Sequence, residues 1–221
     1  MNLQGLVMSF RNFAALFLFF VCSCTNNEPN PKIERFFGAN ISNSIRKGHS
    51  YTDKAGAEYF YAYIRVTITN DSLIPMKLKI AFKNEYYQPT PTNGQKFKVF
   101  LIPENRTNEK QTDFDFLNKF LDQGLENPIS LNKVLFPKEE CVLNIGFLTG
   151  IGSTLNPSPF VLFSKGHKQN FQSISDSLIN NTASDNNQLT LLLGLDFYSL
   201  GLDSIKRYSI IPCGQISYCK L

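Results

Sequence analysis

The chain has 221 residues, of which 43% are hydrophobic, 18% charged and 13% aromatic, with 20 Phe, 9 Tyr and no Trp. This composition is too apolar and too weakly charged for an intrinsically disordered protein, and one domain of this length can bury about 70% of its unfolded surface. The formal net charge of +4 lies well below the clustered basic excess of a dedicated nucleic-acid-binding protein, and two His leave little material for acid–base or metal chemistry. We therefore expect a globular protein that has no nucleic-acid partner.

The N-terminal segment combines one positive charge with a short apolar run. Arg11 is the only charged side chain before Cys24, and the apolar run over residues 13–22 follows it closely. A run of about ten residues is too short to cross a bilayer core as a helix, which takes about 20. The order of charge and apolar run is typical of a secretory signal peptide, which we expect over residues 1–23.

The leader ends in Val21-Cys22-Ser23-Cys24. This sequence resembles the lipobox of bacterial lipoproteins, of a Bacteroidota-like type: an aliphatic residue, two small residues and then the Cys that becomes the mature N-terminus. The resemblance implies diacylglycerol on the Cys24 thiol, cleavage after Ser23 and a further fatty-acyl chain such as palmitate on the new amine. Cys22 stands where Ala, Thr or Ser is more common and is a rival acceptor. The alternatives are an ordinary cleaved secretory signal and an apolar N-terminus of a cytosolic protein.

Residues 24–32 contain the predicted lipidated Cys and a polar tether stiffened by Pro29 and Pro31. In lipoproteins of this class, Asp directly after the lipidated Cys is the usual signal for retention in the inner membrane, and here Thr25 occupies that place. The resemblance therefore implies an outer-membrane anchor, and the domain would face either the periplasm or the cell surface.

Two segments with a period of two predict the clearest strands. In residues 58–69, the apolar row from Phe60 to Ile68 alternates with a row that begins with three tyrosines. After Pro75 the alternation resumes over residues 76–83. The short break between the two segments predicts that they pair as an antiparallel hairpin with one buried face.

The rest of the chain predicts shorter elements. A short helix is expected over residues 113–123, because Thr112 can cap its N-terminus, apolar residues recur at helical spacing and Gly124 can end it. Residues 165–187 are polar and predict a long loop with at most a short helix near residues 174–179. Further strands are expected over residues 96–102, 141–147, 160–163, 189–198 and 208–211.

Several half-buried strands with irregular spacing and one inserted helix predict a mainly β fold, an antiparallel immunoglobulin-like β-sandwich formed by residues 33–221 as a single domain. The segment Val66–Ser72 and the Pro137-Lys138-Glu139-Glu140 turn loosely resemble immunoglobulin-like domains of bacterial lipoproteins. That resemblance implies no functional residues.

Lipidation of Cys24 would leave Cys141, Cys213 and Cys219 in the mature protein. These thiols allow three alternative single disulfides, 141–213, 141–219 and 213–219. We favour Cys213–Cys219, because Gly214 can supply a turn between the two cysteines. Cys141 would then be a buried thiol on the inward face of a strand. A zinc site that combines these thiols with His49 or His167 is disfavoured, because neither a close Cys pair nor a close His pair supports it.

Residues 150–154, Gly-Ile-Gly-Ser-Thr, follow a predicted strand but lack the Lys of a P-loop and the third Gly of a dinucleotide site. Glu139 and Glu140 are interpreted as turn residues, and Asp113 and Asp115 as residues of a helix cap. No nucleophile elbow or zinc-protease motif occurs in the sequence. We therefore expect neither catalysis nor a metal or other cofactor.

Tyr59, Tyr61 and Tyr63 lie at i, i+2 and i+4 of the first predicted strand. Exposed, they would form an aromatic ledge for a glycan or for an apolar patch of a partner. The alternative is that the helix or the second sheet covers this row.

The leading hypothesis is a non-catalytic, membrane-anchored envelope lipoprotein that acts as a binding or assembly module for another envelope protein or a glycan. One alternative is a carbohydrate-binding lipoprotein that uses the tyrosine row. The other is an envelope hydrolase whose carboxylates are distant in sequence, such as Glu58 and Asp196.

Overall fold

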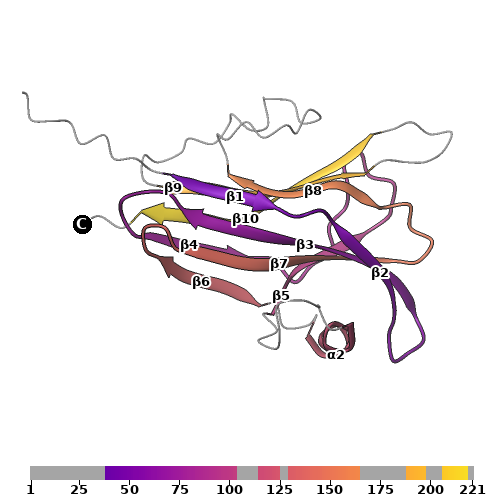
Figure 1. The fold of residues 1–221 in the computed structure, drawn as a ribbon. Helices are drawn as coiled ribbons and strands as arrows, with labels where there is room; N and C mark the ends of the chain where they lie inside the picture. The colour runs from indigo at the N-terminus through magenta and orange to yellow at the C-terminus, as the bar shows by residue number, and fades with distance from the viewer. Residues whose placement is uncertain (1–37, 104–113, 125–128, 165–187, 198–205, 219–221) are drawn as a thin grey trace, which may run out of the picture. The chain divides into compact units, whose positions relative to one another are not determined.

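The computed structural model describes five stretches of the chain, residues 38–103, 114–124, 129–164, 188–197 and 206–218 (Figure 1). All of them belong to one compact unit, Phe36–Leu221. In the described stretches, ten strands form two antiparallel sheets, and one helix, α2 (Phe114–Gly124), lies between the fifth and sixth of these strands along the chain.

The first sheet, which we call sheet A, is built around the longest strand, β3 (Glu58–Asn70). Its strands run in the order β1-β3-β7-β5, and β2 also pairs with β3. β1 pairs with the C-terminal half of β3 and β2 with its N-terminal half, so that together they cover one edge. The bounds of the other four strands are β1 (Ala39–Asn43), β2 (Lys47–Thr52), β5 (Phe97–Ile102) and β7 (Glu140–Gly150).

The second sheet, sheet B, has the order β6-β4-β10-β9-β8. Its central strand, β10, pairs with β4 on one side and β9 on the other, with a register shift between Pro212 and Gly214. The bounds of its strands are β4 (Met76–Ala81), β6 (Ser130–Leu135), β8 (Pro157–Ser164), β9 (Gln188–Phe197) and β10 (Arg207–Tyr218).

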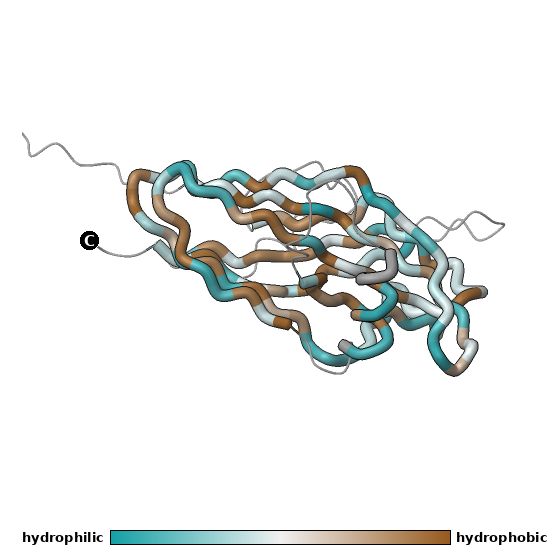
Figure 2. The backbone as a smooth tube through the Cα atoms, turned by 60° about the horizontal axis from the view of Figure 1, so that its bottom comes forward, coloured by the Kyte–Doolittle hydropathy of each residue, from teal (hydrophilic) through white to brown (hydrophobic). Residues whose placement is uncertain are grey.

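The apolar rows of the two sheets face each other and form the main core. Along β3, the even-numbered residues from Ala62 to Ile68 are all buried in it, because successive side chains of a strand point to opposite faces. Figure 2 shows hydrophobic stretches running along the strands, whereas the β2–β3 hairpin is mostly hydrophilic. Four aromatic rings meet at the centre of the core: Phe97, Phe147, Phe160 and Phe197.

The structure confirms the predicted mainly β, antiparallel sandwich with one short helix. The immunoglobulin-like part of that prediction is not confirmed. In immunoglobulin domains the last strand lies at the edge of its sheet, whereas here the last described strand, β10, lies between β4 and β9.

The predicted antiparallel hairpin between residues 58–69 and 76–83 is wrong. β3 belongs to sheet A and β4 to sheet B, and the loop over residues 71–75 carries the chain across the core. A period of two shows only which face of each strand is apolar. Two such faces are buried equally well when the strands stack across a sandwich as when they pair side by side.

Three strands were not predicted, β1, β2 and β6, and all three lie at sheet edges. β2 exposes five of its six residues, so it lacks the apolar row that marks a central strand. The helix was predicted within one residue of its observed bounds. The predicted loop over residues 165–187, with its short helix near 174–179, lies outside the described residues.

Candidate functional site

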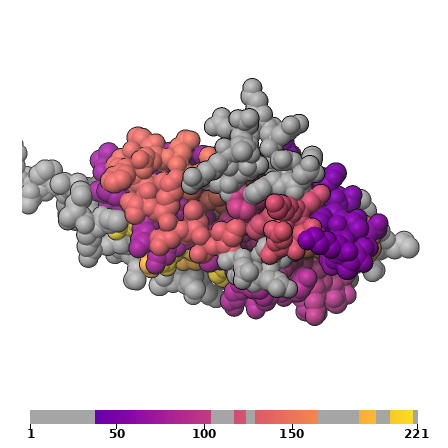
Figure 3. All heavy atoms as spheres, turned by 90° about the horizontal axis from the view of Figure 1, so that it is seen from below, coloured from indigo at the N-terminus to yellow at the C-terminus, as the bar shows by residue number. Residues whose placement is uncertain are grey.

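A second group of buried side chains lies on the outer face of sheet A beneath α2, and we call it the tyrosine layer. Its sheet residues come from the odd-numbered row of β3 and from β2, β5 and β7, and α2 contributes its apolar stripe. Figure 3 views the molecule from this side and shows α2 next to the β2–β3 hairpin. The buried members are Tyr51, Tyr61, Tyr63, Phe100, Ile102, Leu117, Leu121 and Leu148, with Tyr59 and Phe120 packed at the margin.

The predicted row of tyrosines is therefore largely covered. Tyr61 is 0% exposed and Tyr63 8%, and their rings stack on each other with centroids 6.3 Å apart. Only Tyr59 is partly exposed. An exposed ledge of three rings is thus not present, and the alternative of a row covered by the helix is what the structure shows. The cause is the amphipathic helix, because Leu117 and Leu121 need an apolar surface to cover.

The margin of this layer carries polar contacts between the hairpin and the helix. Tyr51 donates a hydrogen bond through Oη to a carboxylate oxygen of Asp122 in α2, and Lys54 Nζ lies 3.9 Å from the other oxygen. Tyr51 also stacks on Tyr59 with ring centroids 5.9 Å apart. Asp53 shapes the hairpin turn by accepting hydrogen bonds from the backbone N–H groups of residues 55 and 57 at 2.9 and 2.8 Å. We call Tyr51, Asp53, Lys54, Tyr59 and Asp122 the hairpin rim.

Burial and nearby carboxylates keep these tyrosines protonated. Burial raises the pKa of Tyr51 first, and the hydrogen bond to Asp122 raises it further. The pKa of Tyr59 is raised by burial and by Asp53, and burial raises the pKa of Tyr61 to about 12. At neutral pH the hydroxyls of Tyr51, Tyr59 and Tyr61 are therefore neutral, which suits packing and hydrogen bonding and does not suit a tyrosinate nucleophile.

Tyr61→Phe and Tyr51→Phe are expected to change stability in opposite directions. Tyr61 Oη is buried and has no hydrogen-bond partner among the described residues, so removing it relieves a desolvation cost and stabilises the fold by up to about 1 kcal/mol. Tyr51→Phe removes the hydrogen bond to Asp122 and should destabilise by about 1 kcal/mol. Urea unfolding of the two variants measures both changes.

The difference in stability between Tyr61→Phe and the wild type should also depend on pH. An unfolded Tyr loses its proton near pH 10, whereas folded Tyr61 keeps it until about pH 12, so the stability of the wild type is unaffected by this titration below pH 10 and falls as the pH rises from about 10 to about 12. The free energy of unfolding of the Tyr61→Phe variant should therefore decline less steeply over this pH interval than that of the wild type. A decline equal to that of the wild type, or a loss of stability in Tyr61→Phe at pH 7, would contradict this account of Tyr61.

The predicted turn carboxylates have structural contacts. Glu139 accepts a hydrogen bond from the backbone N–H of Phe136 at 2.8 Å, and Glu140 accepts one from Thr69 Oγ1 at 3.3 Å. Asp196 is buried in β9 of sheet B, with Oδ2 3.3 Å from Lys206 Nζ, whereas Glu58 is exposed at the start of β3 in sheet A. Asp113 lies outside the described residues, as does the side chain of Asp115.

The turn at Gly214 on which the favoured Cys213–Cys219 disulfide depends is not formed. Gly214 forms no turn, because residues 213–218 continue β10 as an extended strand. At about 3.3 Å per residue, Tyr218 lies about 16 Å from Cys213, whereas a disulfide needs Cα atoms within about 7 Å. Cys213 is a buried thiol whose Sγ donates to the Leu191 carbonyl at 3.6 Å. Cys141 is buried on the inward row of β7, as predicted, and Cys219 lies outside the described residues.

His49 is exposed on β2, with its ring edge-on to Tyr61 at a centroid distance of 6.1 Å. His167 lies outside the described residues, and within the described stretches no group of three His, Cys, Asp or Glu could hold a metal ion. Residues 150–154 form a turn after β7, in which Ser153 N donates to Gly150 O at 3.2 Å.

Tyr51 and Asp122 were not singled out from the sequence. Asp122 directly follows the last apolar residue of the helix stripe, which is the only signal that it lies at the margin of the covered face. Tyr51 lies in an edge strand whose pattern is mostly polar, and its role depends on a contact 71 residues away in the chain.

No protein-family model, no curated protein and no solved structure matches the chain. In the part of the chain that the structure describes, no helix has both the length and the apolar character needed to cross a membrane.

Proposed function

We propose that the protein is a non-catalytic lipoprotein of the bacterial cell envelope, anchored in the outer membrane through Cys24, and that its β-sandwich acts as a binding or assembly module. The observation that carries the proposal is the sequence Val21-Cys22-Ser23-Cys24 directly after a short apolar run. Each buried CH₂ contributes about 0.8 kcal/mol to membrane binding, so that two or three acyl chains make a stable anchor where one does not.

A binding or assembly role is supported by the contacts of the polar side chains. Glu139, Glu140 and Asp196, which are among the described carboxylates, engage backbone, hydroxyl and ammonium groups of the fold itself. The hairpin rim, in contrast, offers a partly exposed tyrosine beside the exposed ammonium of Lys54 and the carboxylate of Asp53. Such a mixed aromatic and charged margin suits another envelope protein or a glycan.

The test of the anchor is the Cys24→Ala variant of the full chain, expressed in a bacterium that processes lipoproteins and labelled with palmitate. We expect label to be lost, and the protein to remain as an uncleaved precursor or to leave the membrane fraction. Cys22→Ala is the matched control, because it removes a Cys from the same segment and should keep the label. Normal labelling of Cys24→Ala would refute the assignment, and loss of label only in Cys22→Ala would move the anchor to Cys22.

A further inference from the structure

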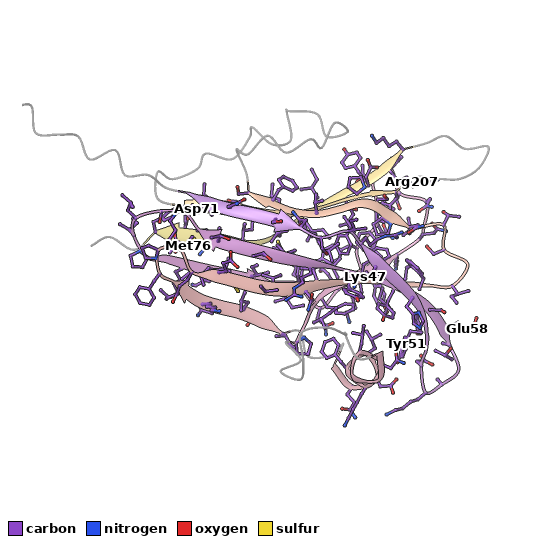
Figure 4. The ribbon with its side chains drawn as sticks, in the orientation of Figure 1. Lys47, Tyr51, Glu58, Asp71, Met76 and Arg207 are labelled. Carbon is purple, nitrogen blue, oxygen red and sulfur yellow. The ribbon has the colours of Figure 1, made fainter. Side chains whose placement is uncertain are left out.

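Two loops at one end of the sandwich expose large apolar side chains. Leu73, between β3 and β4, is 75% exposed, and Phe136, between β6 and β7, is 58% exposed. In Figure 4, Asp71 and Met76 mark this end, and Glu58 marks the opposite one. We call Leu73 and Phe136 the apolar tips.

A buried polar network holds the two loops together. Asn70 Nδ2 donates to the carbonyls of Ile74 and Leu135, both at 2.9 Å, and thereby joins one loop to the other. The backbone adds two hydrogen bonds, from Asn70 N to Glu139 O at 3.0 Å and from Lys138 N to Asn70 O at 2.8 Å. The exposure of both tips is therefore set by the ordered fold around them.

The Asn70 network also fixes the conformation of the first loop. Ser72 is fully buried, and its Oγ lies 2.6 Å from Asn70 Oδ1 and 2.7 Å from Ile74 O. Leu73 follows directly and points its side chain away from this network, as its exposure shows. Single exposed apolar residues are common on protein surfaces, but these two lie on joined, ordered loops at the same end of the sandwich.

The chain from the predicted anchor enters the sandwich at this same end. Ala39 pairs with Asn70, and Asp71 N donates to Gly38 O at 3.0 Å. At no more than about 3.6 Å per residue, the segment from Cys24 to Gly38 reaches about 50 Å at most. The opposite end lies farther away by the length of the 13-residue strand β3, or about 40 Å. Because the tether is attached at the end with the apolar tips, that end can contact the leaflet at any extension of the tether, whereas the opposite end could contact it head-on only if the tether extended by about 40 Å.

We propose that this end of the sandwich docks on the lipid leaflet that holds the anchor, with Leu73 and Phe136 inserted among the headgroups. The inference rests on the proposed anchor at Cys24. Lys138, whose side chain is 73% exposed, lies 3.3 Å from Asp71 at the same end and provides a polar collar beside the two apolar side chains. Docking would orient the hairpin rim away from the membrane, since the β2–β3 hairpin connects at the opposite end of β3.

The absence of Trp from the chain permits a direct test. Leu73→Trp and Phe136→Trp each introduce a single fluorophore at a tip, and Ile151→Trp, at a position 53% exposed beside the Gly150–Tyr59 pair of the opposite end, is the matched control. The acylated full-length variants are reconstituted into phosphatidylethanolamine and phosphatidylglycerol vesicles with brominated acyl chains. We expect blue-shifted emission and loss of most intensity for the two tip variants, and neither change for Ile151→Trp.

The intact mass of each preparation separates the two proposals. If the intact mass shows no attached acyl chains, the proposed anchor at Cys24 is refuted. Acylated protein in which both tip variants fluoresce like Ile151→Trp leaves the anchor standing and overturns the docking. Tips that are unquenched in vesicles but shielded from iodide in native envelope fragments would show a protein partner and also overturn it. Thermal midpoints of the three variants, which should agree with each other, control for folding.

Discussion

Replacing Phe147 by Ala is expected to lower the free energy of unfolding by about 3–5 kcal/mol. Phe147 is 0% exposed, and its ring centroid lies 5.1 Å from that of Phe97, 6.0 Å from that of Phe197 and 6.4 Å from that of Phe160. Phe97 belongs to sheet A with Phe147, whereas Phe160 and Phe197 belong to sheet B. The substitution therefore opens a cavity at the place where the two sheets contact each other.

The measurement is thermal or urea unfolding with Phe136→Ala as the control, because that variant makes the same chemical change at an exposed loop position. For a domain of this size, each 1 kcal/mol corresponds to about 2–4 °C in Tm, so Phe147→Ala should unfold about 6–20 °C earlier. Phe136→Ala should stay within about 0.5 kcal/mol of the wild type. Equal destabilisation by the two variants would contradict the central position assigned to Phe147.

Gly214→Ala is expected to destabilise the fold by about 3 kcal/mol, at the upper end of the usual cost of overpacking. A Cβ atom at this position would lie 2.1 Å from the backbone oxygen of Lys79 and 3.0 Å from Cα of Ile80. Both atoms belong to β4, whose pairing with β10 places Gly214 opposite Ile80. Because the obstacle is backbone, β10 and β4 must separate at Gly214, which lies next to the register shift in the pairing of β10 with β9.

Gly150→Ala is the matched control, since a Cβ atom there would meet nothing within 4 Å. The free energy of unfolding of Gly150→Ala should be close to that of the wild type, and that of Gly214→Ala should be well below it. If Gly214→Ala were as stable as Gly150→Ala, the close approach of β10 to β4 would be wrong. Hydrogen exchange of the backbone amides of β4 and β10 would locate the damage, because protection should fall first along this pair.

The elements that were predicted well from the sequence are those with a long and regular apolar pattern. β3 alternates over its whole length, and α2 has apolar residues at helical spacing and ends at Gly124. In such segments the burial of one face decides the conformation, and that face can be recognised in the sequence. Edge strands such as β2 bury little, so their pairing depends on backbone hydrogen bonds, which have no residue signature.

The candidate site was predictable only in part. The row of Tyr59, Tyr61 and Tyr63 on one strand face follows from the period of two alone. Whether that face contacts solvent depends on where α2 packs, and residue spacing within β3 contains no information about the helix. The apolar tips were not predicted, because a Leu or Phe within a turn has the same local pattern whether it is exposed or packed.

The sequence by itself determined the β-rich class, the helix before Gly124, which face of each long strand is apolar, and the lipobox-like leader on which the proposed anchor depends. Only the tertiary structure decided that β3 and β4 lie in opposite sheets, that the tyrosine row is covered, and that Leu73 and Phe136 are both exposed at the end where the chain enters. The physical reason is that periodicity reports local burial, whereas the choice of neighbour depends on contacts between residues far apart in the chain.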